Sequence, residues 1–398
     1  MTRTTRRPRR LSFVAVWLLT RGLMVFQLAY SRLGSSVDYQ DLNVFRQWAI
    51  EIATTHQIPK IDSWQYPPGA IPVFLIPRAT PNHYFEAFVV MALSADLLTT
   101  MALESMSRRE GHTEGLWLWL LGIPTLGTLG ILRFDLIPTC IAVVALTLST
   151  QRRLFGVLVG LGMAVKAWPV LLLLSIKKRS DARAAAFAAS AVVAVFMLAS
   201  WLTLKNSFEF LVNQQHRGLE LEAVAATPWY LRQAIFGTPV HWAMRNGSYE
   251  ILSVTADLVA QVLHVSMLIL AITLATWWVK WTRRSNTAPG VGRDAAFTAL
   301  LLYVVFSEVL SPQYLIWLIG VGAVAITCAD SQMRRPVLWV ALSVVLTQAL
   351  ATTWVNLVTY GSVGASLLVM RNVALAVAAV DASLIMWRVV RPRTDTGG

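Results

Sequence analysis

Residues 6–30 read RRPRRLSFVAVWLLTRGLMVFQLAY, so a basic cluster directly precedes the mostly apolar run from Leu11 to Tyr30. At about 1.5 Å per residue, a helix of this length spans the roughly 30 Å hydrocarbon core of a membrane. The run contains Arg21 and lacks a small-residue cleavage pattern, which disfavours a cleaved signal peptide. It predicts a first membrane span with the N-terminus inside.

The composition extends this prediction to the whole chain. Of 398 residues, 56% are hydrophobic and only 14% are charged, with a mean hydropathy of +0.57, which excludes a soluble domain. A net charge of +13 would suggest a nucleic-acid partner in a soluble protein. Here the Lys and Arg residues lie mainly in short loops and tails between apolar runs, as the positive-inside rule requires. We therefore expect membrane lipids and no nucleic acid as partners.

Basic clusters predict the topology, because each separates two apolar segments. They are Arg108-Arg109, Arg152-Arg153, Lys177-Lys178-Arg179, Arg283-Arg284, Arg334-Arg335 and the tail from Arg388 to Arg393. Spans are expected at about 11–30, 85–104, 116–132, 136–150, 183–204, 250–279, 296–310, 313–328, 337–354 and 367–388. Residues 153–176 fit only as a hairpin broken near Lys166-Ala167-Trp168-Pro169, since proline interrupts a helix.

These assignments predict an all-α polytopic transmembrane bundle with about twelve crossings and both termini in the cytoplasm. Residues 1–10 form a basic arm, residues 11–390 a single membrane domain, and residues 391–398 a cytoplasmic tail. The outer face would carry loops 31–84 and 205–249 and three turns at Arg133, Lys166 and Ser311. Ile71 to Pro77 is too short to cross and is expected at the membrane interface.

Two carboxylates in the first outer loop are candidate bases. Asp41 precedes an amphipathic run and is expected near a helix start at the membrane surface, where it would deprotonate an attacking hydroxyl. Asp38 is a second candidate in the same stretch. The alternative for both is a solvated or turn-forming aspartate.

Charged residues in apolar surroundings form the second group of candidates. A lysine at the hairpin tip, Lys166, either pairs with an aspartate or lies beside an anionic lipid head group. Arg133 and Asp135 either pair with each other or contribute to the same site. Arg21, Asp96 and Asp257 are candidate intramembrane charges that would pair within the bundle.

The loop 205–249 contains His216-Arg217-Gly218-Leu219-Glu220-Leu221-Glu222. This run is either a solvated surface or a site for a phosphate and a sugar, because arginine binds phosphate and carboxylates accept hydrogen bonds from hydroxyls. No P-loop, GxGxxG or GxSxG motif is present, nor an Asp-x-Asp pair or a metal-site spacing of histidines. No cofactor is therefore expected, and a metal requirement is not indicated.

Six segments of the chain stand out together: Asp41-Leu42-Asn43-Val44-Phe45; Tyr66-Pro67-Pro68-Gly69; Arg133-Phe134-Asp135-Leu136-Ile137-Pro138; Gly162-Met163-Ala164-Val165-Lys166-Ala167-Trp168-Pro169; His216-Arg217-Gly218-Leu219-Glu220; and Ser311-Pro312-Gln313-Tyr314-Leu315-Ile316-Trp317. Through these segments the chain resembles the polytopic GT-C glycosyltransferases, and within them glycosyltransferase family 87, which includes polyprenyl-phosphate-mannose-dependent mannosyltransferases of actinobacteria.

The resemblance implies an inverting transfer of a hexose, mannose above all, from a polyprenyl-phosphate-linked donor to a lipid or glycan acceptor outside the plasma membrane. Asp41, or Asp38 in its place, would be the catalytic base. Lys166, Arg217 and Arg133 would stabilise the leaving phosphate, and the polyprenyl chain would lie between spans near Trp168 and Trp317. The remaining expected substrate-binding residues are Tyr66, Asp135, His216, Glu220, Gln313 and Tyr314.

Two other classes of function remain open at this stage. A transporter or flippase of lipid-linked sugars would also contain intramembrane charges and a broken hairpin, although no internal repeat is visible. A non-catalytic protein of an envelope-assembly complex would use the same charges only for helix packing. Formation of product by the purified protein would distinguish these classes.

Overall fold

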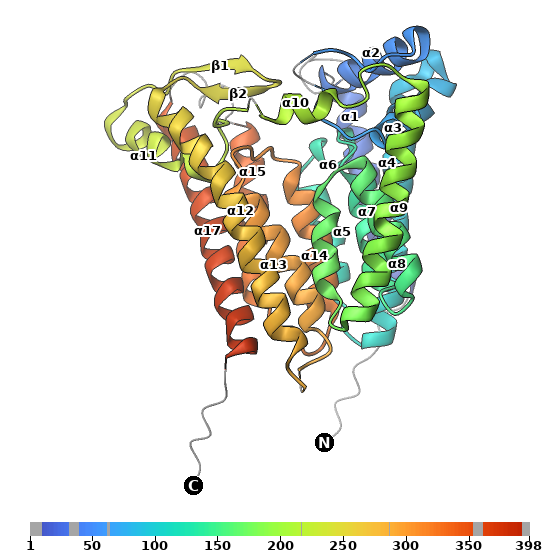
Figure 1. Cartoon of the computed structure of the whole chain (residues 1–398). Coiled ribbons are helices and arrows are strands. Elements are labelled where there is room, and N and C mark those ends of the chain that lie inside the picture. Colours follow the sequence, from blue (N-terminus) through green and yellow to red (C-terminus); the bar gives the residue numbers. More distant parts are fainter. Residues whose placement is uncertain are drawn as a thin grey trace.

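A computed structural model describes residues 10–31, 40–61, 64–215, 217–285, 287–352 and 361–391 (Figure 1). The described part is nearly all helical, as predicted. Five of its helices are long and apolar enough to cross a membrane. They are α1 (Arg10–Ser31), α4 (Tyr84–Glu110), α9 (Arg179–Thr203), α12 (Val254–Thr282) and α17 (Ser362–Val390). This protein is therefore a membrane protein, whereas the count of twelve crossings stays a prediction.

A set of shorter helices forms the interior of the bundle. They are α5 (Glu114–Thr125), α7 (Leu136–Thr147), α8 (Arg152–Val165), α13 (Val291–Phe306) and α14 (Tyr314–Thr327). Every residue of α14 from Leu315 to Thr327 is buried. By contrast, only 11% of the most apolar window of α12 and 17% of that of α9 is buried. α9 and α12 therefore lie on the outside of the bundle and expose most of their apolar side chains, as lipid-facing helices do.

The short helices reach the same height as the long ones at one end of the bundle only, which we call the level end. At that end, Arg152 at the start of α8 pairs with Asp181 at the start of α9, at 3.1 Å. Likewise, Arg293 near the start of α13 pairs with Glu110 at the end of α4, at 2.8 Å. At about 1.5 Å per residue, the 14 residues of α8 extend about 21 Å and the 25 residues of α9 about 38 Å. The inner helices thus stop short of the opposite end. We use the name recess for the level between their ends and the short elements that cover this end.

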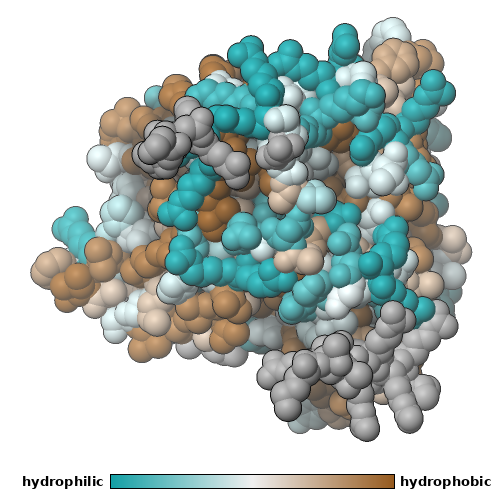
Figure 2. Space-filling view, turned by 90° about the horizontal axis from the view of Figure 1, so that it is seen from below, coloured by the Kyte–Doolittle hydropathy of each residue, from teal (hydrophilic) through white to brown (hydrophobic). Residues whose placement is uncertain are grey.

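The basic clusters gather at the level end, where α1 begins and α17 ends (Figure 1). Three contacts join them: Arg179 donates to the Thr282 hydroxyl at 3.3 Å, Lys177 to the Thr287 hydroxyl at 2.9 Å, and Arg284 to the Val390 carbonyl at 2.6 Å. Figure 2, a view onto this end, shows hydrophilic residues across its centre and hydrophobic surface along parts of its margin. The separation of charge predicted from the sequence is present, and the side on which the termini lie stays a prediction.

The opposite end is covered by short elements from two parts of the chain. They are α2 (Gln40–Thr55), α3 (Ala70–Leu75), α10 (Glu209–Gln215), α11 (Thr227–Phe236) and the antiparallel strands β1 (Trp242–Arg245) and β2 (Ser248–Ile251). The fold is nearly all-α, as predicted, and this two-stranded hairpin is a departure from that prediction. Its turn is Asn246-Gly247, with φ of 46° and 71°, the left-handed pair that a two-residue hairpin needs.

Two proline-containing segments behave differently from each other. The predicted broken hairpin is confirmed: α8 ends at Val165, and the 3₁₀ helix η4 (Trp168–Ser175) starts with Pro169 in its first turn. The span predicted at 116–132 is wrong as one continuous helix. It divides into α5 and α6 (Leu129–Leu132) around Gly127, whose φ of 61° ends the helical path.

The charged residues predicted within the membrane form ion pairs in part, as expected. Arg21 of α1 and Asp96 of α4 form a buried ion pair at 2.7 Å, and the Trp17 indole also donates to Asp96. This pairing confirms the prediction for two of the three residues. Asp257 lies exposed in the first turn of α12 and forms no ion pair among the described residues.

Candidate functional site

The centre of the recess is an ion pair between two inner-helix ends. Lys166 follows the last residue of α8, and Asp135 precedes α7. The Lys166 ammonium lies 2.7 Å from Asp135 Oδ1, and the Trp317 indole N–H donates to the same oxygen at 2.7 Å. Asp135 is only 1% exposed and Lys166 14% exposed. Of the two predicted alternatives for Lys166, the structure thus shows pairing with an aspartate.

Four aromatic rings enclose the Lys166 ammonium. Its nitrogen lies 4.6 Å from the ring centre of Trp317, 4.9 Å from Phe134, 5.2 Å from Tyr314 and 5.7 Å from Tyr66. Aromatic faces attract cations at such distances. Trp317 stacks on Tyr314 at 4.0 Å and on Trp168 at 5.4 Å. Both tryptophans are buried in this stack, and the position of the polyprenyl chain near them stays a prediction.

A second ion pair lies closer to the surface. Arg133, between α6 and α7, pairs with Asp41 in the first turn of α2. The Asp41 side chain is 39% exposed, so the carboxylate is held in place and still reaches solvent. Of the two alternatives for Arg133 and Asp135, the structure shows no pairing between them: each pairs with a different residue, and both belong to the same recess. Asp38, the alternative base, lies outside the described residues.

The Tyr66-Pro67-Pro68-Gly69 segment places Tyr66 through a close backbone approach. A Cβ built on Gly69 would lie 2.5 Å from the carbonyl carbon of Ala164, near the end of α8. Only glycine permits this contact. The segment is anchored on its other side as well, since the Gln65 amide donates to the backbone carbonyl of Asn246 in the β-hairpin turn.

The loop before α11 places Glu220 next to the start of α14. The Glu220 backbone N–H donates to the Glu308 carbonyl at 3.0 Å, and Glu220 Oε1 accepts a hydrogen bond from Ser311 at 3.3 Å. Burial, and secondarily the nearby Glu222, raise the pKa of Glu220 to about 7. Glu222 is itself paired with Arg371 of α17 at 2.8 Å. His216, predicted beside these residues, lies outside the described part of the chain.

Four buried polar atoms of the predicted site residues have no hydrogen-bond partner among the described residues. They are Asp135 Oδ2, Arg217 Nε, Glu220 Oε2 and Gln313 Oε1. Arg217 lies within electrostatic reach of Tyr66, Lys166, Glu220 and Tyr314, so these groups share one region. Buried polar groups in proteins are nearly always paired. Two acceptors, a carboxyl oxygen and a guanidinium N–H without partners suit a polar ligand with hydroxyls and an anionic group.

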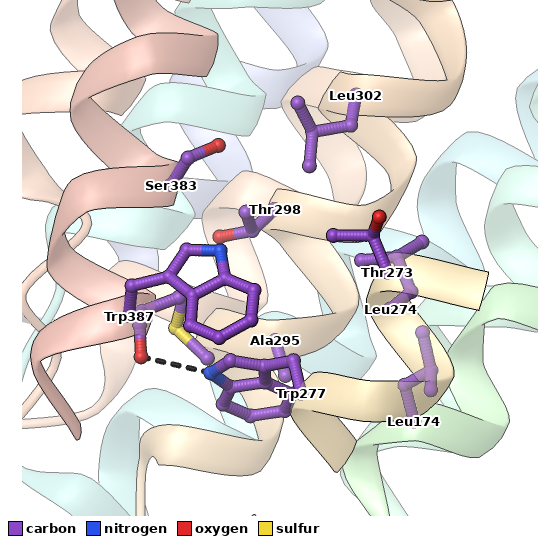
Figure 3. A pocket seen from close by; sticks show the side chains of 10 residues that line it. Leu174, Thr273, Leu274, Trp277, Ala295, Thr298, Leu302, Ser383 and Trp387 are labelled. Carbon is purple, nitrogen blue, oxygen red and sulfur yellow. Dashed lines mark hydrogen bonds between the residues drawn. The ribbon is translucent and has the colours of Figure 1, made fainter. Parts of the chain in front are cut away.

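Two observations limit what else the structure offers as a site. A cavity of about 30 Å³ between α12, α13 and α17 is lined mainly by apolar side chains, among them Leu274, Trp277 and Trp387 (Figure 3). It has room for a water molecule and not for a sugar. No group of three or more metal-ligating side chains occurs among the described residues. Metal independence stays a prediction.

Sequence reasoning missed the role of one residue of this region and did not name another. Trp317 was expected to contact lipid and instead orients Asp135. Arg371 was not singled out, although a cation within the apolar α17 is a recognisable signal of a buried pair. Its guanidinium holds both the carboxylate and the backbone carbonyl of Glu222, and so fixes the loop that carries Glu220.

Comparison with known proteins identifies the family. Residues 64–312, more than half of the chain, match the model of glycosyltransferase family 87. The match contains Tyr66, Arg133, Asp135, Lys166, His216, Arg217 and Glu220, and it begins after Asp41 and ends before Gln313. No match was found among curated proteins. The protein belongs to glycosyltransferase family 87 and is a glycosyltransferase of the membrane.

Proposed function

We propose that this enzyme transfers a hexose, mannose above all, from a polyprenyl-phosphate-linked donor to a lipid or glycan acceptor on the outer face of the plasma membrane. The observation that carries the proposal is the recess at the end opposite the basic clusters, with its four buried unpaired polar atoms. A lipid-linked sugar has its phosphate and hydroxyls at the membrane surface, next to the hydrocarbon core. The polar groups of the site lie at the ends of the short inner helices, and the long helices extend beyond them.

The proposed reaction is a displacement at the anomeric carbon. The acceptor oxygen attacks this carbon while the bond to the donor phosphate oxygen breaks, and the acceptor proton passes to Asp41. The bond electrons remain on the departing lipid phosphate. Attack from the side opposite the leaving group inverts the anomeric configuration. Cationic groups stabilise the leaving phosphate better than a second acid would. Three cations lie at the recess, Arg133, Lys166 and Arg217, and the first two are paired with Asp41 and Asp135.

The half-exposed position of Asp41 supports its role as base. An acceptor approaches from solvent or from the membrane surface, and Asp41 is the carboxylate of the cluster with 39% of its side chain exposed. Arg133 restricts the orientation of that carboxylate, and Tyr66, Asp135, His216, Glu220, Gln313 and Tyr314 are proposed to contact the donor or acceptor. No cofactor is proposed.

The direct test is product formation by the purified protein. The protein in detergent or lipid nanodiscs would be mixed with radiolabelled polyprenyl phosphoryl mannose and an envelope lipid extract as acceptor. A new labelled glycolipid or glycan, with inverted anomeric configuration, supports the proposal. A transporter would instead move the labelled lipid between leaflets of proteoliposomes without forming a glycosidic bond, and a non-catalytic assembly protein would do neither.

Orientation in the membrane is tested by cysteine labelling of intact cells. Cysteine introduced at the exposed positions Lys60 or Arg245, both at the recess end, should react with an impermeant maleimide from outside. Cysteine at the exposed position Arg283, at the basic end, should react only after the cells are opened. The two native cysteines, Cys140 and Cys328, are buried and should contribute little background. Labelling of the Arg283 position in intact cells would show that the protein has the opposite orientation, and it would contradict the proposal of a donor outside the membrane.

A further inference from the structure

The pairing of charges leaves two of the described residues that were predicted for the site without an opposite charge. Asp41 pairs with Arg133, Asp135 with Lys166, and Glu222 with Arg371. Arg217 and Glu220 form no ion pair within the described residues, and each has a buried atom without a partner, Nε and Oε2 respectively. A cation already neutralised by a buried aspartate has less charge to offer a ligand than one that is not. Arg217 is therefore better suited to an anion than Lys166 is.

Glu220 is held so that one of its oxygens is used and the other is free for a ligand. Oε1 accepts from the Ser311 hydroxyl, and the carboxyl also accepts from the backbone N–H of Leu310. Oε2 is buried and has no partner among the described residues. With a pKa of about 7, raised first by burial and then by Glu222, the carboxyl is substantially protonated at neutral pH, so that Oε2 can carry a proton and act as a donor.

The charged and titratable surroundings of Glu220 come from several elements. They are Arg217 and Glu222 of its own loop, Glu308 of the loop before α14, Glu250 of β2, Tyr230 of α11, Tyr314 of α14 and Arg371 of α17. Among these, the Glu308 carboxylate lies 3.6 Å from the imidazole of His264 of α12. The His264–Glu308 pair is therefore a second place in this region where a proton can bind. Any pH dependence must be assigned among Glu220, Glu222, whose carboxyl pKa is also raised by burial, and this second pair.

We propose that Arg217 and Glu220 together bind the phosphate of the lipid-linked donor, with the neutral Glu220 carboxyl and the Arg217 guanidinium each donating a hydrogen bond to a phosphate oxygen. This assignment rests on the proposed function. The donor phosphate is a diester with one negative charge, which accepts hydrogen bonds from both groups. Ionised Glu220 would repel that charge and compete for Arg217, so donor binding should weaken as Glu220 loses its proton. Glu220 keeps its proton during transfer and is a binding group, not the general base.

Binding of farnesyl phosphoryl mannose, measured by calorimetry without acceptor, tests the assignment. Its diester charge is constant between pH 6 and pH 8, so titration of the ligand does not enter. If only the protein with neutral Glu220 binds, affinity should fall about tenfold from pH 6 to pH 8. Glu220→Gln supplies a permanent N–H donor and should bind at both pH values as wild type does at pH 6. Arg217→Met should lose affinity roughly 10- to 150-fold throughout, as expected for one charge-assisted hydrogen bond.

Glu308→Gln is the matched control, because Glu308 is a buried carboxylate on the adjacent loop. It should retain the wild-type pH dependence. Loss of the dependence in Glu308→Gln and not in Glu220→Gln would assign it to the His264–Glu308 pair and overturn the proposal. Glu220→Asp keeps a titrating carboxyl and should keep the dependence if Glu220→Gln fails to fold, as judged by thermal unfolding.

The experiment also separates this assignment from the proposed function. Binding of the diester by wild type with equal affinity at pH 6 and pH 8 would overturn the Arg217 and Glu220 assignment alone. Absence of binding at every pH would overturn the lipid-phosphate donor and, with it, both proposals.

Discussion

Replacing Asp41 by Asn is expected to lower the rate of sugar transfer by a factor of about 100 to 10,000, the usual loss when a general base is removed. Asn retains the shape of the side chain and an oxygen that can accept from Arg133, so the contact between α2 and the α6–α7 turn should persist. The measurement is initial rate with saturating donor and acceptor. Donor binding should change little, because the loss is confined to the chemical step.

Asp38→Asn is the matched control for this prediction, since Asp38 is the other loop carboxylate considered as base. It should retain most of the activity, and both variants should insert into the membrane and unfold at temperatures close to wild type. Wild-type turnover by Asp41→Asn together with inactivity of Asp38→Asn would transfer the role of base to Asp38.

The long spans were predictable because their signal is local. Predicted spans 11–30, 85–104, 183–204, 250–279 and 367–388 coincide with α1, α4, α9, α12 and α17 to within a few residues at most ends. Hydropathy and flanking basic residues suffice for such helices. The break within 116–132 was missed because hydropathy does not register the left-handed conformation of Gly127. The Asn246-Gly247 turn was a recognisable hairpin signal that the membrane reading passed over.

Which residues belong to the site was easier to predict than which of them form ion pairs with each other. Polar residues are few in an apolar chain, so Arg133, Asp135 and Lys166 stood out. Residues two apart around a helix start do not face each other. Arg133 is extended, with φ of −106° and ψ of 135°, and its partner Asp41 is 92 positions away in sequence (133 − 41). Such a contact depends on how α2 folds over the bundle, which no local pattern in one sequence encodes.

Lys166→Met is expected to lower the free energy of unfolding by about 3–5 kcal/mol, because it leaves the buried Asp135 carboxylate without its counter-ion. Asp135→Asn in the same protein removes the stranded charge and keeps an oxygen for the Trp317 indole, so the double variant should recover most of the loss. The stability of Lys166→Arg should lie between those of wild type and Lys166→Met, since arginine keeps the charge but places a planar guanidinium among four aromatic rings. Thermal and denaturant unfolding in detergent measure all three.

The same variants decide between the two roles considered for Lys166. If the lysine mainly anchors Asp135, stability should fall in Lys166→Met, and the double variant should regain donor affinity along with stability. If Lys166 instead holds the donor phosphate, Lys166→Met should remain as stable as wild type while the KM for donor rises, and the Asp135→Asn change should not rescue it. Three features favour the anchoring role: the 2.7 Å pair, the 1% exposure of Asp135 and the enclosing rings. A cation committed to a buried aspartate holds the ends of α7 and α8 together, and this arrangement leaves phosphate recognition to Arg217.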